Sequence, residues 1–346
     1  MSASTVCALL SCSGQSTGSV TRRSWRGQHE QPRWRCWRLT SRWSRGVGTL
    51  DIKFDIAFVG HYTKDTIVTP QGTRTVHGGA FRYGAHVAAK MGLKAAVVTR
   101  LAREDFEVVD DLTRLGVEVL AKPTAQSTSL RLVYPTADLD QRSISVEGDA
   151  GAFTVAEVAP VQAQVFHIGA SIRGEVPPRV IEALAQKGGK VSLDVQGFIR
   201  INQDGKLVHA HWPEKAQVLG LVNVLKTDGV EAEFLTGKKD IREAAKTLAT
   251  FGPQEIVATH RDGVLVYAGG RFYEAPFFPR EVRGRTGRGD TCIAAYLGKR
   301  LAAPPAKATV WAAALTSLKM EQEGPFRREI SEVEALIRRA DSLLMG

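Results

Sequence analysis

The chain has 346 residues, of which 46 are Lys or Arg and 36 are Asp or Glu, giving a formal net charge of +10. Its length and its 43% of hydrophobic residues allow a substantial core, which excludes a disordered polymer, a coiled coil and a disulfide miniprotein. No apolar run approaches the roughly 18 residues that a membrane helix needs. The first 50 residues hold eight arginines and one acid, which leaves 38 basic and 35 acidic residues in 51–346. Because that remainder is close to neutral, we expect neither nucleic acid nor a membrane as a partner.

Residues 1–50 differ in composition from the rest of the chain. They contain three of the four cysteines and four of the six tryptophans, are rich in Ser and Arg, and show no apolar periodicity. The apolar stretch 6–10 is too short for a secretory signal, and the positive charges follow it instead of preceding it. We interpret this segment as a disordered extension from a start codon placed too early, with synthesis beginning near Leu50. A mitochondrial transit peptide and a genuine basic arm remain the alternatives.

From residue 51 onward, short apolar strands alternate with helical patterns. The expected strands are 56–59, 95–98, 165–168 and 190–195, followed by a hairpin of 255–258 and 264–267. The expected helices include 84–91, 106–115, 241–249 and 292–301. This alternation predicts a single α/β domain over 51–346, with a mostly parallel sheet covered by helices on both faces.

Two segments interrupt the alternation. Residues 61–77 are polar and rich in turn formers, and in 128–147 apolar and polar residues alternate as they do in a strand. We expect these two segments to form a small β-sheet that projects from the main domain. The only cysteine after residue 50 is Cys292, which excludes a disulfide framework or a zinc cluster there. We expect Cys292 to be a packed core residue. Because a single cysteine in 51–346 is compatible with a reducing compartment, we expect a cytoplasmic location.

One motif near the C-terminus points to chemistry. Residues 284–291 read Gly-Arg-Thr-Gly-Arg-Gly-Asp-Thr and precede the last of these helices. Gly287 and Gly289 permit a tight turn that leaves backbone N–H groups unpaired at the positive end of the helix dipole. Such a loop favours an anion, especially one whose charge grows during phosphoryl transfer. Asp290 could then accept a proton from an attacking hydroxyl. The spacing alone equally allows a glycine loop in which Asp290 simply caps the helix.

The residues of this motif resemble a known family. Thr286-Gly-Arg-Gly-Asp290 is similar to the C-terminal signature of PfkB/ribokinase-family carbohydrate kinases, which usually reads Asp-Thr-x-Gly-Ala-Gly-Asp. Weaker matches follow the family's order over 51–346. They are Gly78-Gly79 before a helix, Gly60 with Asp65 in a first sugar-contacting loop, Lys226 to Glu231 beside nucleotide and metal, and Thr259 to Gly263 in a nucleotide turn. The resemblance implies a ribokinase-like α/β fold with a β-sheet lid, and an ATP-dependent kinase of a small sugar or cyclic polyol.

The same resemblance implies roles for the glycine loop. Asp290 would be the general base, and the backbone N–H groups of Gly287, Arg288 and Gly289 would form an anion hole. Gly284 replaces the leading Asp of the signature, which argues against a family-type monovalent-cation site. The lid would close over the substrate and exclude water. Because lids of this fold often pair between subunits, a homodimer is an open expectation.

The resemblance also implies a nucleotide site and a substrate site. Lys226, Asp228, Thr259 and Gly263 would contact ATP, and Glu231 would organise Mg²⁺ through water. The residues expected around the substrate are Asp65, Gly78, Gly79, Tyr83, Asp194, Gln196 and Arg200. Family sugar kinases usually carry Asn at the position of Tyr83, and the polar groups from Asp194 onward follow a strand at its carboxyl end. Together these residues resemble the inositol-kinase-like branch, which makes myo-inositol the expected acceptor.

Two other functions stay open at this point. A nucleoside kinase of the same fold would keep the reaction and change the acceptor. A non-catalytic nucleotide- or sugar-sensing protein is suggested by the shortened nucleotide turn and by Ala313, which stands where some members carry an Asn. Retention of Asp290 and of both loop glycines argues against such a sensor.

Overall fold

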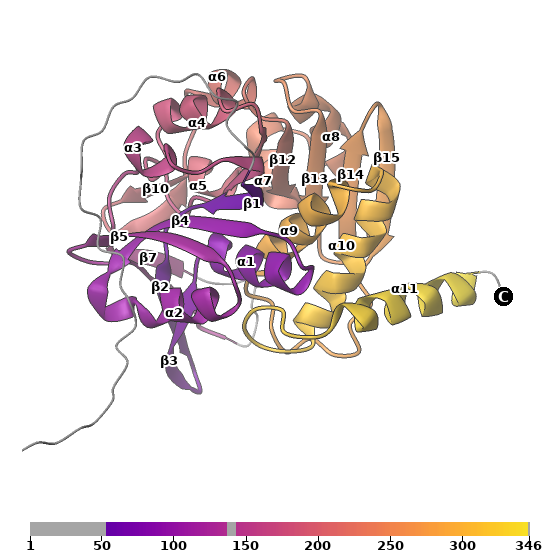
Figure 1. Cartoon of the computed structure of the whole chain (residues 1–346), viewed down its shortest axis with the longest axis horizontal. Coiled ribbons are helices and arrows are strands. Elements are labelled where there is room, and N and C mark those ends of the chain that lie inside the picture. The colour runs from indigo at the N-terminus through magenta and orange to yellow at the C-terminus, as the bar shows by residue number, and fades with distance from the viewer. Residues whose placement is uncertain (1–52, 137–142, 345–346) are drawn as a thin grey trace, which may run out of the picture. The chain divides into compact units, whose positions relative to one another are not determined.

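The main sheet has nine strands, and the successive side chains of each strand point to opposite faces of the sheet. A computed structural model describes residues 53–136 and 143–344 (Figure 1), and the extension predicted at 1–50 lies outside them. In spatial order the strands are β15 (Arg271–Pro276), β14 (Gly263–Ala268), β13 (Glu255–Thr259), β12 (Val224–Asp228), β9 (Lys190–Asp194), β8 (Ala163–Ile168), β1 (Phe54–Val59), β4 (Ala95–Ala102) and β5 (Glu118–Thr124). All neighbours from β13 to β5 pair in parallel, whereas β14 and β15 add an antiparallel edge.

Helices cover both faces of this sheet, as the alternation of strands and helices predicts (Figure 1). One hydrophobic cluster contains Ile56 and Phe58 of β1, and the other contains Ala57 and Val59. The helices of the first cluster are α1 (Ala80–Lys90), α2 (Glu107–Arg114), α9 (Arg288–Arg300), α10 (Pro305–Met320) and α11 (Ile330–Leu344). Those of the second are α3 (Val155–Val158), α4 (Pro178–Ala185), the short α5 (Gln196–Ile199), α6 (Lys215–Leu219), α7 (Gly229–Thr236) and α8 (Ile241–Ala249). Among the described residues, no helix is long and apolar enough to cross a membrane.

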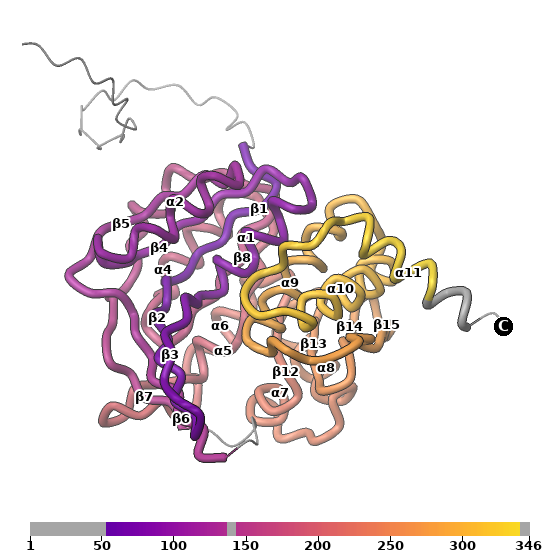
Figure 2. Tube along the Cα trace, turned by 90° about the horizontal axis from the view of Figure 1, so that it is seen from below, coloured from indigo at the N-terminus to yellow at the C-terminus, as the bar shows by residue number. Residues whose placement is uncertain are grey.

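A second sheet of six strands forms the expected lid (Figure 2). Its order is β10 (Arg200–Gln203), β11 (Lys206–His209), β7 (Ser143–Gly148), β6 (Thr128–Val133), β2 (Thr63–Thr69) and β3 (Gly72–Gly78). The hairpin of β10 and β11 was not expected from the sequence, because its few residues show no apolar alternation. The strand predicted over 190–195 ends at Asp194 and is followed by the one-turn helix α5 (Gln196–Ile199), which turns the chain into β10. All described residues belong to one compact unit.

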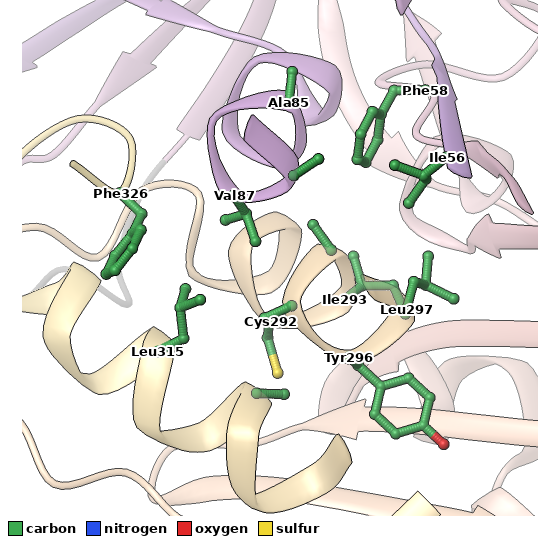
Figure 3. Packing of buried hydrophobic residues seen from close by; sticks show 14 of the residues in the cluster. Ile56, Phe58, Ala85, Val87, Cys292, Ile293, Tyr296, Leu297, Leu315 and Phe326 are labelled. Atoms are coloured by element: carbon green, nitrogen blue, oxygen red, sulfur yellow. The ribbon is translucent and has the colours of Figure 1, made fainter. Parts of the chain in front are cut away.

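The first hydrophobic cluster connects α1, α9 and α10, the helices that carry much of the site described below (Figure 3). Val87, Cys292 and Leu315 come from these three helices and are fully buried, so Cys292 is a core residue as expected. The approach of α1 to β1 depends on Gly84, because a Cβ there would lie 2.3 Å from a ring carbon of Phe58. The position of α1 over the sheet is therefore set by a close contact that only glycine allows.

We predict that Gly84→Ala lowers the free energy of unfolding by about 1–3 kcal/mol, because the added methyl group forces Phe58 or the helix to move. Urea denaturation followed by circular dichroism measures this change. Gly220→Ala is the matched control, since a Cβ at Gly220, which ends α6, would meet its nearest atom at 3.4 Å. We expect a change within about 0.5 kcal/mol for the control. Equal stabilities of the two variants would contradict the packing argument.

Candidate active site

The candidate site lies at the carboxyl edge of the main sheet, next to the lid. Asp194, Asp228 and Thr259, the last residues of β9, β12 and β13, line a cavity of about 950 Å³. Ligands of open α/β proteins bind at this edge, outside the ends of parallel strands. The lid contributes apolar lining residues, which are Ile67, Val76, Leu130, Leu132, Ile144, Leu207 and Val208. The cavity thus combines polar strand ends from the main sheet with apolar side chains from the lid.

The start of α9 places Asp290 at this cavity. Gly287 caps the helix with a φ of 74°, a left-handed conformation that favours glycine. A Cβ on Gly287 would also lie 2.3 Å from the ring of Tyr83, so the loop and the ring are in direct contact. The helix begins at Arg288 and not at the predicted residue 292, because the left-handed turn at Gly287 brings the next residues into helical geometry at once. Asp290 consequently lies in the first turn of α9 and lines the cavity.

The backbone of this turn offers N–H groups to an anion. The N–H of Arg288 donates to the carbonyl of Arg285 at 3.1 Å, so we narrow the predicted anion hole to the N–H groups of Gly287 and Gly289. Positive charge is close by, since the Nζ of Lys226 would lie 3.0 Å from a Cβ on Gly289. Arg288 itself lines the cavity. The turn therefore combines N–H donors with cationic side chains, which is the chemistry that binds phosphate groups.

Asp290 has the electrostatic environment of a base that works near neutral pH. Burial and, to a smaller extent, the charge of Asp194 raise the pKa of Asp290 to about 6, against the opposing effect of Lys226 and Lys319. A carboxylate with such a pKa is ionised at neutral pH and is still basic enough to accept a proton from a hydroxyl. Perturbed carboxyl groups of this kind cluster at catalytic sites.

Lys226 is buried between two carboxylates. Its Nζ lies 3.0 Å from Oδ2 of Asp194 and 3.9 Å from Oε2 of Glu231. Burial alone would lower the pKa of Lys226, but the two carboxylates outweigh it and raise that pKa. Burial raises the pKa of Glu231 to about 7, and Lys226 opposes this shift. Asp194, predicted as a substrate residue, thus also holds the lysine in place.

The carboxylates at the start of α7 fit the expected magnesium ion. Asp228 caps the helix, because its Oδ1 accepts the N–H of Glu231 at 2.8 Å, and Oε2 of Glu231 accepts the N–H of Asp228 at 2.9 Å. The other oxygen of Glu231, Oε1, is buried without a hydrogen-bond partner. Within the described ranges, no group of three or more His, Cys, Asp or Glu side chains could hold a metal ion. An ion bound at Glu231 would therefore complete its coordination with water and phosphate oxygens, as Mg²⁺ commonly does.

The predicted substrate residues come together around the same cavity. Its lining includes Asp65 of β2, Gly78 of β3, Gly79, Tyr83 of α1, Asp194, Gln196 and Arg200. Tyr83 is only 2% exposed, and its hydroxyl has no hydrogen-bond partner. Burial raises the pKa of Tyr83, so the hydroxyl stays neutral and can exchange a hydrogen bond with a substrate oxygen.

The predicted nucleotide turn is only partly at the cavity. Thr259 lines it, but Gly263 does not, because it begins β14 on the far side of the turn. The N–H of His260 donates to the carbonyl of Gly263 at 2.9 Å and closes the turn into a tight hairpin. Within the described part of the chain, no residue of 260–282 belongs to the cavity lining.

Lys319 is the main site residue that the sequence analysis missed. It lies at the penultimate position of α10, is fully buried, and lines the cavity. Its Nζ donates to the carbonyl of Gly284 at 2.8 Å and to the carbonyl of Thr286. A lysine near the end of a helix usually extends into solvent, where it interacts favourably with the helix dipole. No sequence signal therefore distinguishes Lys319 from a surface residue.

Comparison with known proteins identifies relatives of known activity. Residues 47–327 match the sequence profile described as pfkB family carbohydrate kinase. A cytidine kinase of Thermococcus kodakarensis is 27% identical in an alignment of 260 residues that covers 70% of this chain and 87% of that protein. A pyrophosphate-dependent kinase in the ribokinase family, solved with a pyrophosphate analog and myo-inositol, is 37% identical. Its TM-score is 0.75, with 81% of this chain and 99% of that chain covered. Ribokinase of Arabidopsis thaliana, solved with ribose and ATP, shares the fold at 20% identity, with a TM-score of 0.66 over 82% of this chain and 99% of that chain.

The raised pKa of Asp290 predicts that this carboxylate destabilises the folded protein. Because the folded state binds the proton more tightly than the unfolded state, the penalty is fully present above about pH 6 and is lost as the pH falls toward the ordinary value of 3.8. Asp290→Asn should therefore raise the free energy of unfolding at pH 8 by about 2–3 kcal/mol. The gain should shrink when the urea denaturation is repeated below pH 5.

The control for this measurement is Asp262→Asn, which removes an exposed carboxylate outside the cavity lining. We expect it to change stability by no more than about 0.5 kcal/mol at either pH. Loss of stability in Asp290→Asn at pH 8 would contradict the electrostatic description of the site.

Proposed function

Because this chain belongs to the pfkB family of carbohydrate kinases, we propose that it transfers a phosphoryl group to a hydroxyl of a cyclic polyol, with myo-inositol as the preferred acceptor. The observation that carries this proposal is Asp290, a carboxylate with a pKa of about 6 in the first turn of α9, beside two loop N–H groups and a buried lysine. A base and an anion site in one cavity are the two parts that phosphoryl transfer to an alcohol requires.

In this mechanism Asp290 removes the proton of the acceptor hydroxyl while the oxygen of that hydroxyl attacks phosphorus. The bond from phosphorus to the leaving oxygen breaks, and the leaving phosphate departs with its electron pair. The N–H groups of Gly287 and Gly289 stabilise negative charge on the transferred group, and the ammonium of Lys226 adds to this stabilisation. Mg²⁺, held by Glu231 and water, would neutralise charge on the donor when bound.

The lining of the cavity supports a polyol as acceptor. Asp65, Gln196 and Arg200 offer polar groups to several hydroxyls, and the unpartnered hydroxyl of Tyr83 offers one more hydrogen bond. Closure of the lid, whose apolar side chains already line the cavity, would exclude water from the reacting phosphorus and limit hydrolysis of the donor. The structural relative at 37% identity was solved with myo-inositol.

We also propose pyrophosphate as the phosphoryl donor, in place of the ATP that the sequence suggested. The relative at 37% identity is pyrophosphate-dependent. Arg283, Arg285 and Arg288 line the cavity around residues 284–289, which we call the anion loop, and guanidinium groups suit a compact polyanion. Of the two residues predicted for the nucleotide turn, only Thr259 lines the cavity, whereas pyrophosphate needs no contact with a base or ribose.

A nucleoside is the second candidate acceptor. The observation that favours it is the 27% identity with a cytidine kinase over 87% of that protein. Phosphorylation of cytidine uses the same base and the same anion loop, so only the acceptor residues of the cavity separate the two functions.

A panel of two donors and four acceptors tests the proposal. The donors are pyrophosphate and ATP, and the acceptors are myo-inositol, ribose, fructose and cytidine. We expect kcat/KM to be at least ten-fold higher for pyrophosphate with myo-inositol than for any other pair. Selective use of ATP would contradict the donor proposal, and preference for cytidine would replace the polyol by a nucleoside.

Asp290→Asn and Asp262→Asn serve as the variants of this panel. We expect the first to lower kcat by about three or more orders of magnitude while calorimetry shows pyrophosphate binding within a few-fold of wild type, because the base acts mainly in the transition state. The second variant should keep wild-type rates. Full turnover in Asp290→Asn would overturn the assignment of the base.

A further inference from the structure

Lys319 is a buried cation to which the proposed reaction gives no role. It is fully buried, and both of its hydrogen bonds go to backbone carbonyls, those of Gly284 and Thr286. The ring of Tyr83 lies 5.5 Å from Nζ, so an aromatic face also borders the charge. Burial lowers the pKa of Lys319 to about 8, while Asp290 and Glu323 oppose the shift, so most of the amine is charged at neutral pH. Backbone carbonyls are also the ligands that proteins offer to potassium ions.

A free monovalent cation does not fit these residues. The carboxylate that the family signature places at position 284 is missing, and a Cβ on Gly284 would lie 2.3 Å from the carbonyl oxygen of Gln322. The carbonyls of Gly284 and Thr286 already accept hydrogen bonds from Lys319. The chain therefore lacks the anionic ligand and supplies its own positive charge at the carbonyls that remain.

The ammonium acts on the anion loop through one peptide group. The carbonyl of Thr286 and the N–H of Gly287 belong to the same planar peptide and point in opposite directions. A cation at the carbonyl therefore fixes the direction of the Gly287 N–H and increases its strength as a donor. The N–H groups of Arg283 and Gly284 also donate to the carbonyl of Met320, at 2.9 and 3.0 Å, which holds the same segment to the end of α10.

We propose that the ammonium of Lys319 replaces a monovalent cation, positions the anion loop at its residues 284–287, and lets this chain bind its phosphoryl donor without potassium. The inference rests on the proposed function only for the identity of that donor. Lys319 is therefore a positioning residue, because it acts on the donor through the Thr286–Gly287 peptide group.

The wild-type protein gives the first test. Pyrophosphate and, in parallel, ATP are titrated by calorimetry in potassium chloride and in choline chloride of equal ionic strength. Whichever of the two donors binds, we expect its affinity to differ by less than two-fold between the two salts. The thermal midpoint of the wild-type protein should be the same in both salts. A ten-fold or greater gain in affinity with potassium would overturn the proposal.

Lys319→Ala gives the second test, because it leaves space between the carbonyls of Gly284 and Thr286 that a small cation can enter. We expect donor affinity to fall at least ten-fold in choline chloride and to recover mostly in potassium or ammonium chloride, which should also raise the thermal midpoint of this variant alone. Lys319→Met is the matched control, since its neutral side chain fills the space and should leave affinity low in every salt.

Wild-type affinity of Lys319→Ala in choline chloride would contradict the proposal, as would a loss that neither potassium nor ammonium repairs. If Lys319→Ala does not fold, Lys319→Met decides: low affinity at a wild-type thermal midpoint supports the positioning role, and wild-type affinity contradicts it. These measurements require no polyol transfer. A chain that phosphorylates no polyol but binds its donor as described would therefore refute the proposed acceptor and leave this inference standing.

Discussion

Two buried ammonium groups flank the short segment that begins α9, and the arrangement of the site depends on them. Lys226 approaches the backbone of Gly289 from β12, and Lys319 holds the carbonyls of Gly284 and Thr286 from α10. Burying a charge without a partner is costly, so each lysine needs compensation. Asp194 and Glu231 compensate Lys226, whereas backbone carbonyls compensate Lys319. The segment between them is thereby fixed in an electropositive environment before any ligand arrives, which is the preorganisation that electrostatic catalysis requires.

The same burial explains why Asp290 is suited to be a base. A carboxylate in water has a pKa near 4, but burial and the charge of Asp194 bring the pKa of Asp290 to about 6 while the two lysines keep it from rising further. The lid adds apolar side chains to the lining of the same cavity. Exclusion of water strengthens each charge interaction and also removes the competing acceptor of the phosphoryl group. Transfer to a hydroxyl and protection from hydrolysis would thus both depend on closure of the lid over this cavity.

Local patterns made much of the fold and the core of the site predictable from sequence. The alternating strands and helices predicted the parallel sheet, and the glycines around Arg288 predicted the turn that places Asp290, because both depend on residues adjacent in the chain. The β10–β11 hairpin was missed, since four-residue strands with only one or two apolar residues each carry too few residues for a periodic signal. Lys319 was missed because its partners lie 33 and 35 positions away, and its burial depends on how α10 packs against the anion loop. The pairing of Asp194 with Lys226 is hidden for the same reason.

The most direct test of this account is the fate of the phosphoryl group. Wild-type protein, Mg²⁺, pyrophosphate and myo-inositol are mixed, and the products are followed by phosphorus NMR. The account predicts one phosphate monoester of inositol for each orthophosphate released, because the lid, once closed over the substrates, excludes water and leaves the hydroxyl beside Asp290 as the acceptor. Release of two orthophosphates per pyrophosphate with no monoester would mean that water reaches the site as acceptor, which would contradict the central claim.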